Sequence, residues 1–405
     1  MSVASGGFSN ARLERLHDTM AGYVERGEVP GLALLLNRHG ETHVDVLGTL
    51  AIGGSEAVRR DTIFRIASMT KPVVAAAALV LVEECKLRLD EPVDRLLPEL
   101  AQRQVLRRID GPLDETEPAH RSITLRDLLT FRMGFGIVMV PPGTYPIQQA
   151  AARQRIRLGP PLPQDHPAPD EWLRGLGTLP WMYQPGERWL YDTASDVLGV
   201  LIARAAGQPL DAFLRERLFE PLGMVDTDFH VPADKIERLA TSYRVAFKTG
   251  SLVLYDEARG GHWSRPPAFP SGGGGLVSTV DDYLAFGRML LNMGRHGDVR
   301  ILSRPSVEAM TTDQLTPAQK ANSGLAAGYF DAHGWGFGVS IVTQRAAIAG
   351  AVGQYGWDGG LGTSWRTDPR EDLIGILLTQ RAWSSPVPPD VCQDFWNSAY
   401  QAIDD

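Results

Sequence analysis

The sequence predicts an α+β fold in which an antiparallel sheet is flanked by the first and last helices. The chain opens with a helical pattern followed by two strand patterns around a short turn, which is the order of an antiparallel hairpin packed by a helix. The last third alternates apolar and polar residues, as strands do. No regular strand–helix–strand repeat occurs, so a doubly wound parallel sheet is not expected.

The N-terminal elements follow from periodicity and turn residues. A first helix is predicted to end at Gly27. Its apolar face is formed by Leu13, Leu16, Met20 and Tyr23. The apolar run 32–36 and the alternating run 43–46 predict two antiparallel strands, with the turn at 37–40. A buried helix follows, because 73–82 carries no charge.

The middle of the chain is predicted to be mostly helical, with long connections. Helices are expected at 89–97, 123–129, 196–205 and 210–218. Thr124 and Asp127 form a capping box for the second of them. The segment 134–170 is rich in Pro and Gly, and a connection of this length is usually functional or disordered. Its aromatic and Pro content favours a wall over a substrate cleft, with a mobile linker as the alternative.

The last third is predicted to be mainly sheet. Strands are expected at 241–255, on both sides of a turn, and at 334–342, 363–367 and 372–379, with helices at 280–293 and 389–402. The tetraglycine 272–275 lacks the strand-then-G-x-G-x-x-G context of a phosphate loop. We therefore expect it to allow close backbone packing near the cleft.

Composition indicates an ordinary soluble globular protein. Of the 405 residues, 43% are hydrophobic and 22% are charged. The net charge of -8 and the lack of a basic tract argue against nucleic acid as a partner. The N-terminus lacks signal-peptide features, and no apolar run is long enough to cross a membrane. We therefore expect a cytoplasmic protein without a membrane partner.

The cysteine and histidine patterns indicate neither a disulfide framework nor a metal site. Cys85 and Cys392 have no metal or redox spacing, and Cys85, late in the buried helix, is expected to be a packed thiol. The nine histidines are scattered without an H-E-x-x-H, which disfavours a zinc hydrolase. No metal and no cofactor are expected.

An S-x-x-K motif, Ser68 to Lys71, opens the uncharged helical run. Residues i and i+3 share a helix face, so the Ser68 hydroxyl and the Lys71 amine are expected within hydrogen-bond reach. A serine nucleophile needs an adjacent base, and lysine is a base only when its pKa is lowered. The apolar flank and the helix N-terminus are expected to lower the pKa of Lys71. The alternative, a serine cap with a surface lysine, sets that lysine against the helix dipole.

The sequence contains no motif that is typical of other serine hydrolases. No G-x-S-x-G is present, so the nucleophile turn of an α/β-hydrolase is disfavoured. A Ser-His-Asp triad has no local signature here and stays open.

Three motifs occur in a fixed order along the chain: Ser68 to Lys71, the Pro-Gly turn 185–186 that leads to Tyr191, and the glycine-rich 356–360. With these motifs the chain resembles the class C β-lactamase and penicillin-binding-protein superfamily. Within it, the chain is most similar to the family VIII carboxylesterases, over nearly all of its length. The resemblance implies a β-lactamase/transpeptidase-like fold.

Two parts of the chain are expected to meet at the active site of such a fold. The α/β part comprises 1–67 and 226–405, and the mostly helical part comprises 68–225.

The resemblance also implies catalytic roles. Ser68 would be the acyl-accepting nucleophile, Lys71 would hold or take its proton, and Tyr191 would act with Lys71 as the base. The family's Asn in its Y-x-N motif falls on Thr193 here. Since that Asn contacts the amide side chain of β-lactams, its loss weakens the lactamase interpretation.

The family's third motif, K-T-G, has two candidate positions. Lys248-Thr249-Gly250 matches literally but lies between two strand patterns, so it is predicted to be a hairpin tip. The stretch from Trp357 precedes the terminal strands, where the family places this motif, and Trp357 would replace the Lys. Gly360 would then supply the second oxyanion N–H beside that of Ser68, with Gly359 and Trp357 at the substrate.

The residues at this third motif also predict the kind of substrate. Trp357 suggests an apolar pocket for an acyl or alcohol group, since a Trp cannot anchor a substrate carboxylate as a Lys can. Asp358 has no evident role, because a carboxylate near an oxyanion site is unhelpful unless it points away.

The sequence therefore predicts a serine hydrolase that cleaves small-molecule carboxylic esters through an acyl-enzyme on Ser68, without a cofactor. Three alternatives remain. Acyl transfer would use the same acyl-enzyme, β-lactam or D-peptide hydrolysis is disfavoured by Trp357 and Thr193, and a non-catalytic binding protein is disfavoured by the intact Ser68, Lys71 and Tyr191. The oligomeric state is not predicted.

Overall fold

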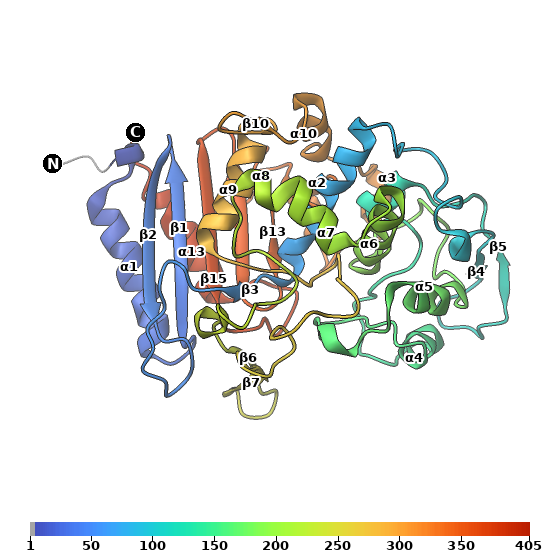
Figure 1. The fold of residues 1–405 in the computed structure, drawn as a ribbon, viewed down its shortest axis with the longest axis horizontal. Helices are drawn as coiled ribbons and strands as arrows, with labels where there is room; N and C mark the ends of the chain where they lie inside the picture. The colour runs from blue at the N-terminus through green and yellow to red at the C-terminus, as the bar shows by residue number, and fades with distance from the viewer. Residues whose placement is uncertain (1–4) are drawn as a thin grey trace.

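The computed structural model describes residues 5–405 and contains an α+β fold built on one large sheet (Figure 1). Seven antiparallel strands form it in the order β11-β12-β13-β14-β15-β1-β2. Their bounds are His333–Trp335 (β11), Ser340–Val342 (β12), Tyr355–Gly359 (β13), Thr363–Asp368 (β14), Leu373–Thr379 (β15), Gly31–Arg38 (β1) and Glu41–Gly48 (β2). The predicted fold class is confirmed.

The first and last helices, α1 (Asn10–Glu25) and α13 (Asp390–Gln401), cover one face of this sheet. Side chains alternate across a strand, and β1 is buried on both faces. Leu34 packs with the two terminal helices, whereas Leu35 packs in the larger core on the other face. The predicted flanking of the sheet by the first and last helices is confirmed.

The helix α2 (Thr70–Glu83) runs through the larger core, and the S-x-x-K motif lies at its start. It is buried along most of its length, as the uncharged run predicts, and packs against α6 (Thr193–Ala206). Ser68 lies just before it, in the one-turn 3-10 helix Ala67–Met69, rather than in α2 itself. That turn lies against β13 and β14, so the nucleophile sits beside the sheet.

The remaining helices surround α2. They are α3 (Leu125–Leu129), α4 (Pro146–Arg153), α5 (Pro169–Gly177), α7 (Leu210–Leu214), α8 (Glu220–Leu222), α9 (Val280–Leu291), α10 (Arg304–Met310), α11 (Pro317–Ala321) and α12 (Tyr329–Ala332). Figure 1 shows α3 to α6 gathered at the end of the molecule opposite α1. The exact division into 1–67 with 226–405 and 68–225 stays a prediction.

Four short strand pairs complete the fold. They are β3 (Phe64–Arg65) with β8 (Val277–Ser278), β4 (Gln104–Leu106) with β5 (Thr116–Pro118), β6 (Ser242–Val245) with β7 (Leu252–Asp256), and β9 (Arg295–His296) with β10 (Val299–Arg300). Lys248-Thr249-Gly250 lies in the turn between β6 and β7, as predicted, and the Gly250 N–H donates to the Ala246 carbonyl at 2.8 Å.

Several local predictions were wrong. The segment 89–97 is not helical, because its backbone pairs with a neighbouring segment at Pro92 and Thr124, and proline cannot donate within a helix. The segment 134–170 is not one connection, because it contains the helix α4 and a 3-10 turn at Pro163–Asp165, and α5 begins at its end. The predicted strand 334–342 is a hairpin of β11 and β12.

The cysteines differ from each other in environment. Cys85 is exposed rather than packed, because α2 ends at Glu83 and Cys85 takes a left-handed φ of 58°. Cys392 is buried, and both are free thiols.

Within residues 5–405, no single helix is long and apolar enough to cross a membrane. Thr193–Ala206 and Leu210–Leu222 together have the length and composition of such a helix, but the two are bent by 78° at the break between them. The cytoplasmic location stays a prediction.

Candidate active site

Ser68 is held at the floor of a cavity by a strained turn. The preceding Ala67 has a φ of 43°, a region that L-residues with a side chain seldom adopt. Lys71 Nζ lies 3.0 Å from Ser68 Oγ, which confirms the contact expected from the i, i+3 spacing. Both Ser68 and Tyr191 line the cavity, whereas the Lys71 side chain is fully buried beneath them.

The surroundings of Lys71 differ from the expected apolar ones. Its Nζ donates to Asp192 Oδ1 at 2.6 Å and to the Gly273 carbonyl, as well as to Ser68. Burial alone lowers the pKa of Lys71, but Asp192, followed by Tyr191 and Asp196, outweighs burial and leaves the pKa above its ordinary value. The expectation of a lowered pKa was therefore wrong. The sequence could not show it, because Asp192 is 121 residues away along the chain.

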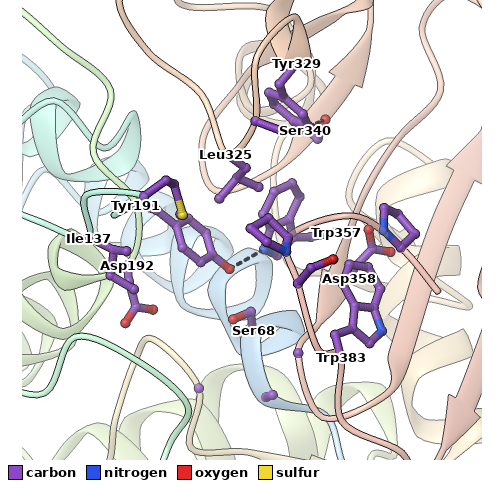
Figure 2. A pocket seen from close by; sticks show the side chains of 18 of the residues that line it. Ser68, Ile137, Tyr191, Asp192, Leu325, Tyr329, Ser340, Trp357, Asp358 and Trp383 are labelled. Atoms are coloured by element: carbon purple, nitrogen blue, oxygen red, sulfur yellow. Dashed lines mark hydrogen bonds between the residues drawn. The ribbon is translucent and has the colours of Figure 1, made fainter. Parts of the chain in front are cut away.

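Tyr191 stands between Lys71 and Trp357. Its hydroxyl oxygen accepts a 2.8 Å hydrogen bond from Trp357 Nε1, drawn in Figure 2, and Tyr191 lines the same cavity as Ser68. Lys71 Nζ lies 4.5 Å from the centre of the tyrosine ring. Burial raises the pKa of Tyr191, and Lys71, Ser68 and Trp357 offset that rise only in part. The free protein therefore holds a neutral phenol next to the nucleophile.

Trp357 combines two roles that the sequence did not reveal together. It lies on β13, and its rings pack 4.6 Å from those of Trp335 and 5.6 Å from that of Tyr191, measured between centroids. Its indole therefore forms an apolar wall, as expected, while its N–H donates to Tyr191. A hydrogen bond to the charged form of an acid favours that form, so Trp357 stabilises a Tyr191 phenolate.

The two glycines of the third motif have different surroundings. A Cβ on Gly359 would overlap the Ile66 carbonyl oxygen and Thr363 Oγ1, so the absence of a side chain lets β13 lie against the turn that carries Ser68. Gly359 does not line the cavity. Gly360 does, and a Cβ there would meet open space.

The cavity above Ser68 has a volume of about 650 Å³ and is mostly apolar. The segment 134–170 contributes one wall of it, which confirms the wall interpretation of that segment. This wall includes Ile137, Met139, Leu158, Pro160, Pro161 and His166. Leu325 and Tyr329 lie above Ser68, and Trp383 lies beyond Trp357 (Figure 2).

The charge of Asp358, a residue for which the sequence predicts no role, is paired with a neighbouring strand of the sheet. Its carboxylate accepts from Ser364 Oγ at 2.6 Å and from Arg366 at 2.6 Å. Both partners lie on β14, so the charge is paired there rather than with the groups that contact Ser68.

The tetraglycine packs closely beside the site, as predicted. A Cβ on Gly272 would overlap the Ser195 carbonyl oxygen. Asp196 holds the loop by accepting from Ser271 Oγ at 2.7 Å and from the Gly273 N–H at 2.9 Å. Burial raises the pKa of Asp196 to about 6. Sequence reasoning missed Asp192 and Asp196, although their four-residue spacing beside Tyr191 places both on one side of a helix start.

Within residues 5–405, no group of three or more His, Cys, Asp or Glu side chains is placed to hold a metal ion. The chemistry that these residues support is nucleophilic: Ser68 accepts a hydrogen bond from the Lys71 amine, and the ring of Tyr191 lies 4.5 Å from the same amine.

This fold and this cluster define a serine acyl-enzyme hydrolase of the β-lactamase type, and comparison with known proteins agrees. A family model described as Beta-lactamase matches residues 16–390, so the chain belongs to the β-lactamase family. Protein Rv1367c of Mycobacterium tuberculosis is 43% identical over 342 residues, covering 83% of this chain and 82% of that protein.

Two further relatives carry names that describe an activity. Esterase EstB of Burkholderia gladioli is 32% identical over 398 residues, covering 94% of this chain and 92% of its own. The solved structure of "EstCE1, a hydrolase with promiscuous acyltransferase activity" superposes with a TM-score of 0.79 at 25% identity, covering 96% of this chain and 98% of that one.

Proposed function

We propose that this protein is a serine carboxylesterase that forms an acyl-enzyme on Ser68. The observation that carries the proposal is the 3.0 Å contact of Ser68 Oγ with Lys71 Nζ, next to Tyr191 at the floor of a mostly apolar cavity. The esterase name of EstB and the description of EstCE1 as a hydrolase support it.

Acylation begins when Ser68 Oγ attacks the ester carbonyl carbon. The Ser68 proton passes to the oxygen of Tyr191. Because Tyr191 is a neutral phenol in the free protein, it acts as the base only in the minor fraction of molecules whose phenol proton has been lost to solvent. The Trp357 N–H and the Lys71 ammonium stabilise that phenolate. When the tetrahedral intermediate collapses, the ester C–O bond breaks and the alcohol leaves with the proton from Tyr191.

Charge on the carbonyl oxygen would be held by backbone donors. The Ser68 N–H lies at the start of α2, where the helix dipole also favours a negative charge, and the Gly360 N–H lies at the cavity on the opposite side. Deacylation repeats the sequence with water: Tyr191 takes a water proton, the hydroxide oxygen attacks the acyl carbon, and the Ser68 oxygen leaves and recovers the proton.

The cavity supports an uncharged substrate. Its walls are mostly apolar, and Trp357 replaces the family's Lys. Two arginines also line the cavity, but Arg366 is paired with Asp358 and Arg157 with Asp165, so a substrate carboxylate would lose its hydration without gaining an unpaired cation. We propose small esters with an apolar acyl or alcohol group as the substrate class.

Acyl transfer is a second candidate, because an alcohol in place of water would accept the same acyl group. The description of EstCE1 as having promiscuous acyltransferase activity supports acyl transfer as an alternative function. The structure gives less support to β-lactam hydrolysis. Thr193, at the position of the family's Asn, is buried, and its hydroxyl does not line the cavity.

The test is turnover of a p-nitrophenyl ester series and of nitrocefin by wild type and by Ser68→Ala. Ester turnover that requires Ser68, with little nitrocefin cleavage, is expected. An alcohol acceptor that yields a new ester, in competition with water, would establish transfer as well. Ester turnover that survives in Ser68→Ala would contradict the Ser68 mechanism.

A further inference from the structure

Asp192 occupies an unfavourable backbone conformation directly after Tyr191. Its φ of 85° and ψ of −72° lie outside the regions that non-glycine residues ordinarily adopt. It is also the residue that precedes the first residue of α6, where an Asp side chain normally accepts from a backbone N–H of the first turn. Its side chain makes no such cap. The carboxylate instead reaches Lys71.

The three acceptors around Lys71 fit an ammonium group. Ser68 Oγ, Asp192 Oδ1 and the Gly273 carbonyl oxygen each accept from Nζ, and an ammonium group has three N–H bonds to give. A neutral amine could donate to Asp192 and Gly273 and accept from the Ser68 hydroxyl, so the count of partners fits both forms. The carboxylate of Asp192, 2.6 Å from the fully buried Nζ, is what favours the ammonium. Asp192 thus adopts a strained backbone conformation and does not cap α6 with its side chain. The contact that its carboxylate makes instead is the ion pair with Lys71.

We propose that Asp192 is a positioning residue that keeps Lys71 protonated and aimed at Ser68, and that it thereby leaves the role of general base to Tyr191. The inference rests on the proposed function and deepens it, because the resemblance leaves open which of the two residues takes the proton. No role had been assigned to Asp192 by the sequence motifs.

The other charged groups near this cluster do not replace Asp192. Asp196, one turn further along α6, directs its carboxylate to Ser271 and Gly273 rather than to Lys71. His166, which approaches Asp192 from the cavity wall, is neutral near pH 7, because burial lowers its pKa to about 4. Asp192 is therefore the carboxylate in direct contact with the ammonium.

Replacing Asp192 by Asn retains its shape and removes its charge. Asp192 raises the pKa of Lys71 and also that of Tyr191, so its removal lowers both. An opposite charge at this distance changes a pKa by about 1 to 3 units. That range applies to Lys71. The acid limb of kcat/KM for a p-nitrophenyl ester follows Tyr191 and should move to lower pH in Asp192→Asn, because the phenolate loses a nearby like charge. Asp192→Glu, which keeps the charge, should restore most of the wild-type profile.

A titration of Lys71 itself tests the inference without any substrate. The chain has five lysines, Lys71, Lys86, Lys235, Lys248 and Lys320, so a protein labelled with ¹³C at the lysine ε-carbon gives few NMR signals. Lys71→Met assigns the signal of interest. In wild type, the titration midpoint of the Lys71 signal should lie at a pH no lower than the midpoints of the other lysines. In Asp192→Asn, the Lys71 midpoint should lie about 1 to 3 pH units lower than in wild type.

The matched control is Asp358→Asn, a carboxylate on the opposite side of the cavity that pairs with Arg366. It should leave the Lys71 titration unchanged. An equal midpoint in wild type and Asp192→Asn would overturn the inference, as would a wild-type Lys71 that titrates well below the other lysines. The wild-type result decides even if Asp192→Asn does not fold. If the wild type cleaves no ester, the proposed function fails while the titration still judges Asp192.

Discussion

The indole N–H of Trp357 donates to the hydroxyl oxygen of Tyr191 across 2.8 Å. This bond joins β13 to the chain segment just before α6. By the resemblance to the β-lactamase superfamily, it places a neutral donor at the position of the Lys in the K-T-G motif. A neutral donor favours the phenolate form of Tyr191 without adding a cation that would bind a substrate carboxylate. The same residue thus supports the base and sets an apolar preference for the substrate.

Trp357→Phe should lower kcat/KM for esters about 10- to 100-fold. The substitution keeps an aromatic wall but removes a hydrogen bond to a charged group, which contributes about 1.5–3 kcal/mol. Because the phenolate loses its donor, the pKa of Tyr191 should rise and the acid limb should move to higher pH. Because burial already holds the pKa of Tyr191 above its ordinary value, steady-state kinetics between pH 5 and 10 follow the rising part of the profile, where the shift appears as a lower kcat/KM at each pH.

Trp335→Phe is the matched control for that substitution. Trp335 packs against Trp357, but its own indole N–H is buried without a hydrogen-bond partner among the described residues. Its replacement should leave the acid limb in place. A limb that moves equally in both variants would mean that ring packing, and not the N–H, supports Tyr191.

Gly359→Ala should destabilise the protein by about 1–3 kcal/mol, because overpacking at a tight contact costs about that much. The added methyl group would overlap the Ile66 carbonyl oxygen and Thr363 Oγ1, and would push β13 away from the Ser68 turn. Gly360→Ala is the neighbouring control, since its methyl group would meet open space. Urea unfolding of the two variants compares them, and equal losses would contradict the packing role given to Gly359.

Longer acyl chains should raise kcat/KM until the cavity of about 650 Å³ is filled. Each buried methylene contributes about 0.8 kcal/mol, or roughly a fourfold gain per carbon in a p-nitrophenyl ester series. A half-ester of succinate should react at least about tenfold more slowly than an uncharged ester of equal length, since its carboxylate must be desolvated.

Leu325→Ala should flatten that chain-length dependence, because the Leu325 side chain lies over the cavity above Ser68 (Figure 2). Turnover of the acetate ester should change little. A preference for the charged half-ester, or a series without any dependence on chain length, would contradict the apolar cavity as the substrate site.

Thr193→Val should leave ester turnover unchanged and stabilise the fold by about 1 kcal/mol. The Thr193 hydroxyl is buried without a hydrogen-bond partner among residues 5–405, and an unsatisfied buried polar group costs about 1–3 kcal/mol. Thermal or urea unfolding measures the change. A clear loss of activity would show that Thr193 retains the role of the family's Asn.

Most of the fold could be predicted because its signals are local. The run 32–36 is apolar throughout because β1 is buried on both faces, and the capping box of Thr124 and Asp127 forms as expected. The failures depend on contacts distant in sequence. The segment around Pro92 pairs with another segment instead of coiling.

The part of the site that depends on local spacing could also be predicted from the sequence. The spacing of Ser68 and Lys71 and the position of Tyr191 placed the cluster correctly. The charge on Lys71 could not be predicted, since it depends on the fold bringing Asp192 to within 2.6 Å. The hydrogen bond from Trp357 to Tyr191 was likewise hidden, because its partners are 166 residues apart.

The most direct test of the central claim is to locate the acyl group after a brief reaction with p-nitrophenyl butyrate. The reaction is quenched in acid, and the digested protein is analysed by mass spectrometry. The account predicts a butyryl group on the peptide that contains Ser68, and none in Ser68→Ala. A butyryl group on another residue that turns over at the catalytic rate, or full activity of Ser68→Ala, would contradict it.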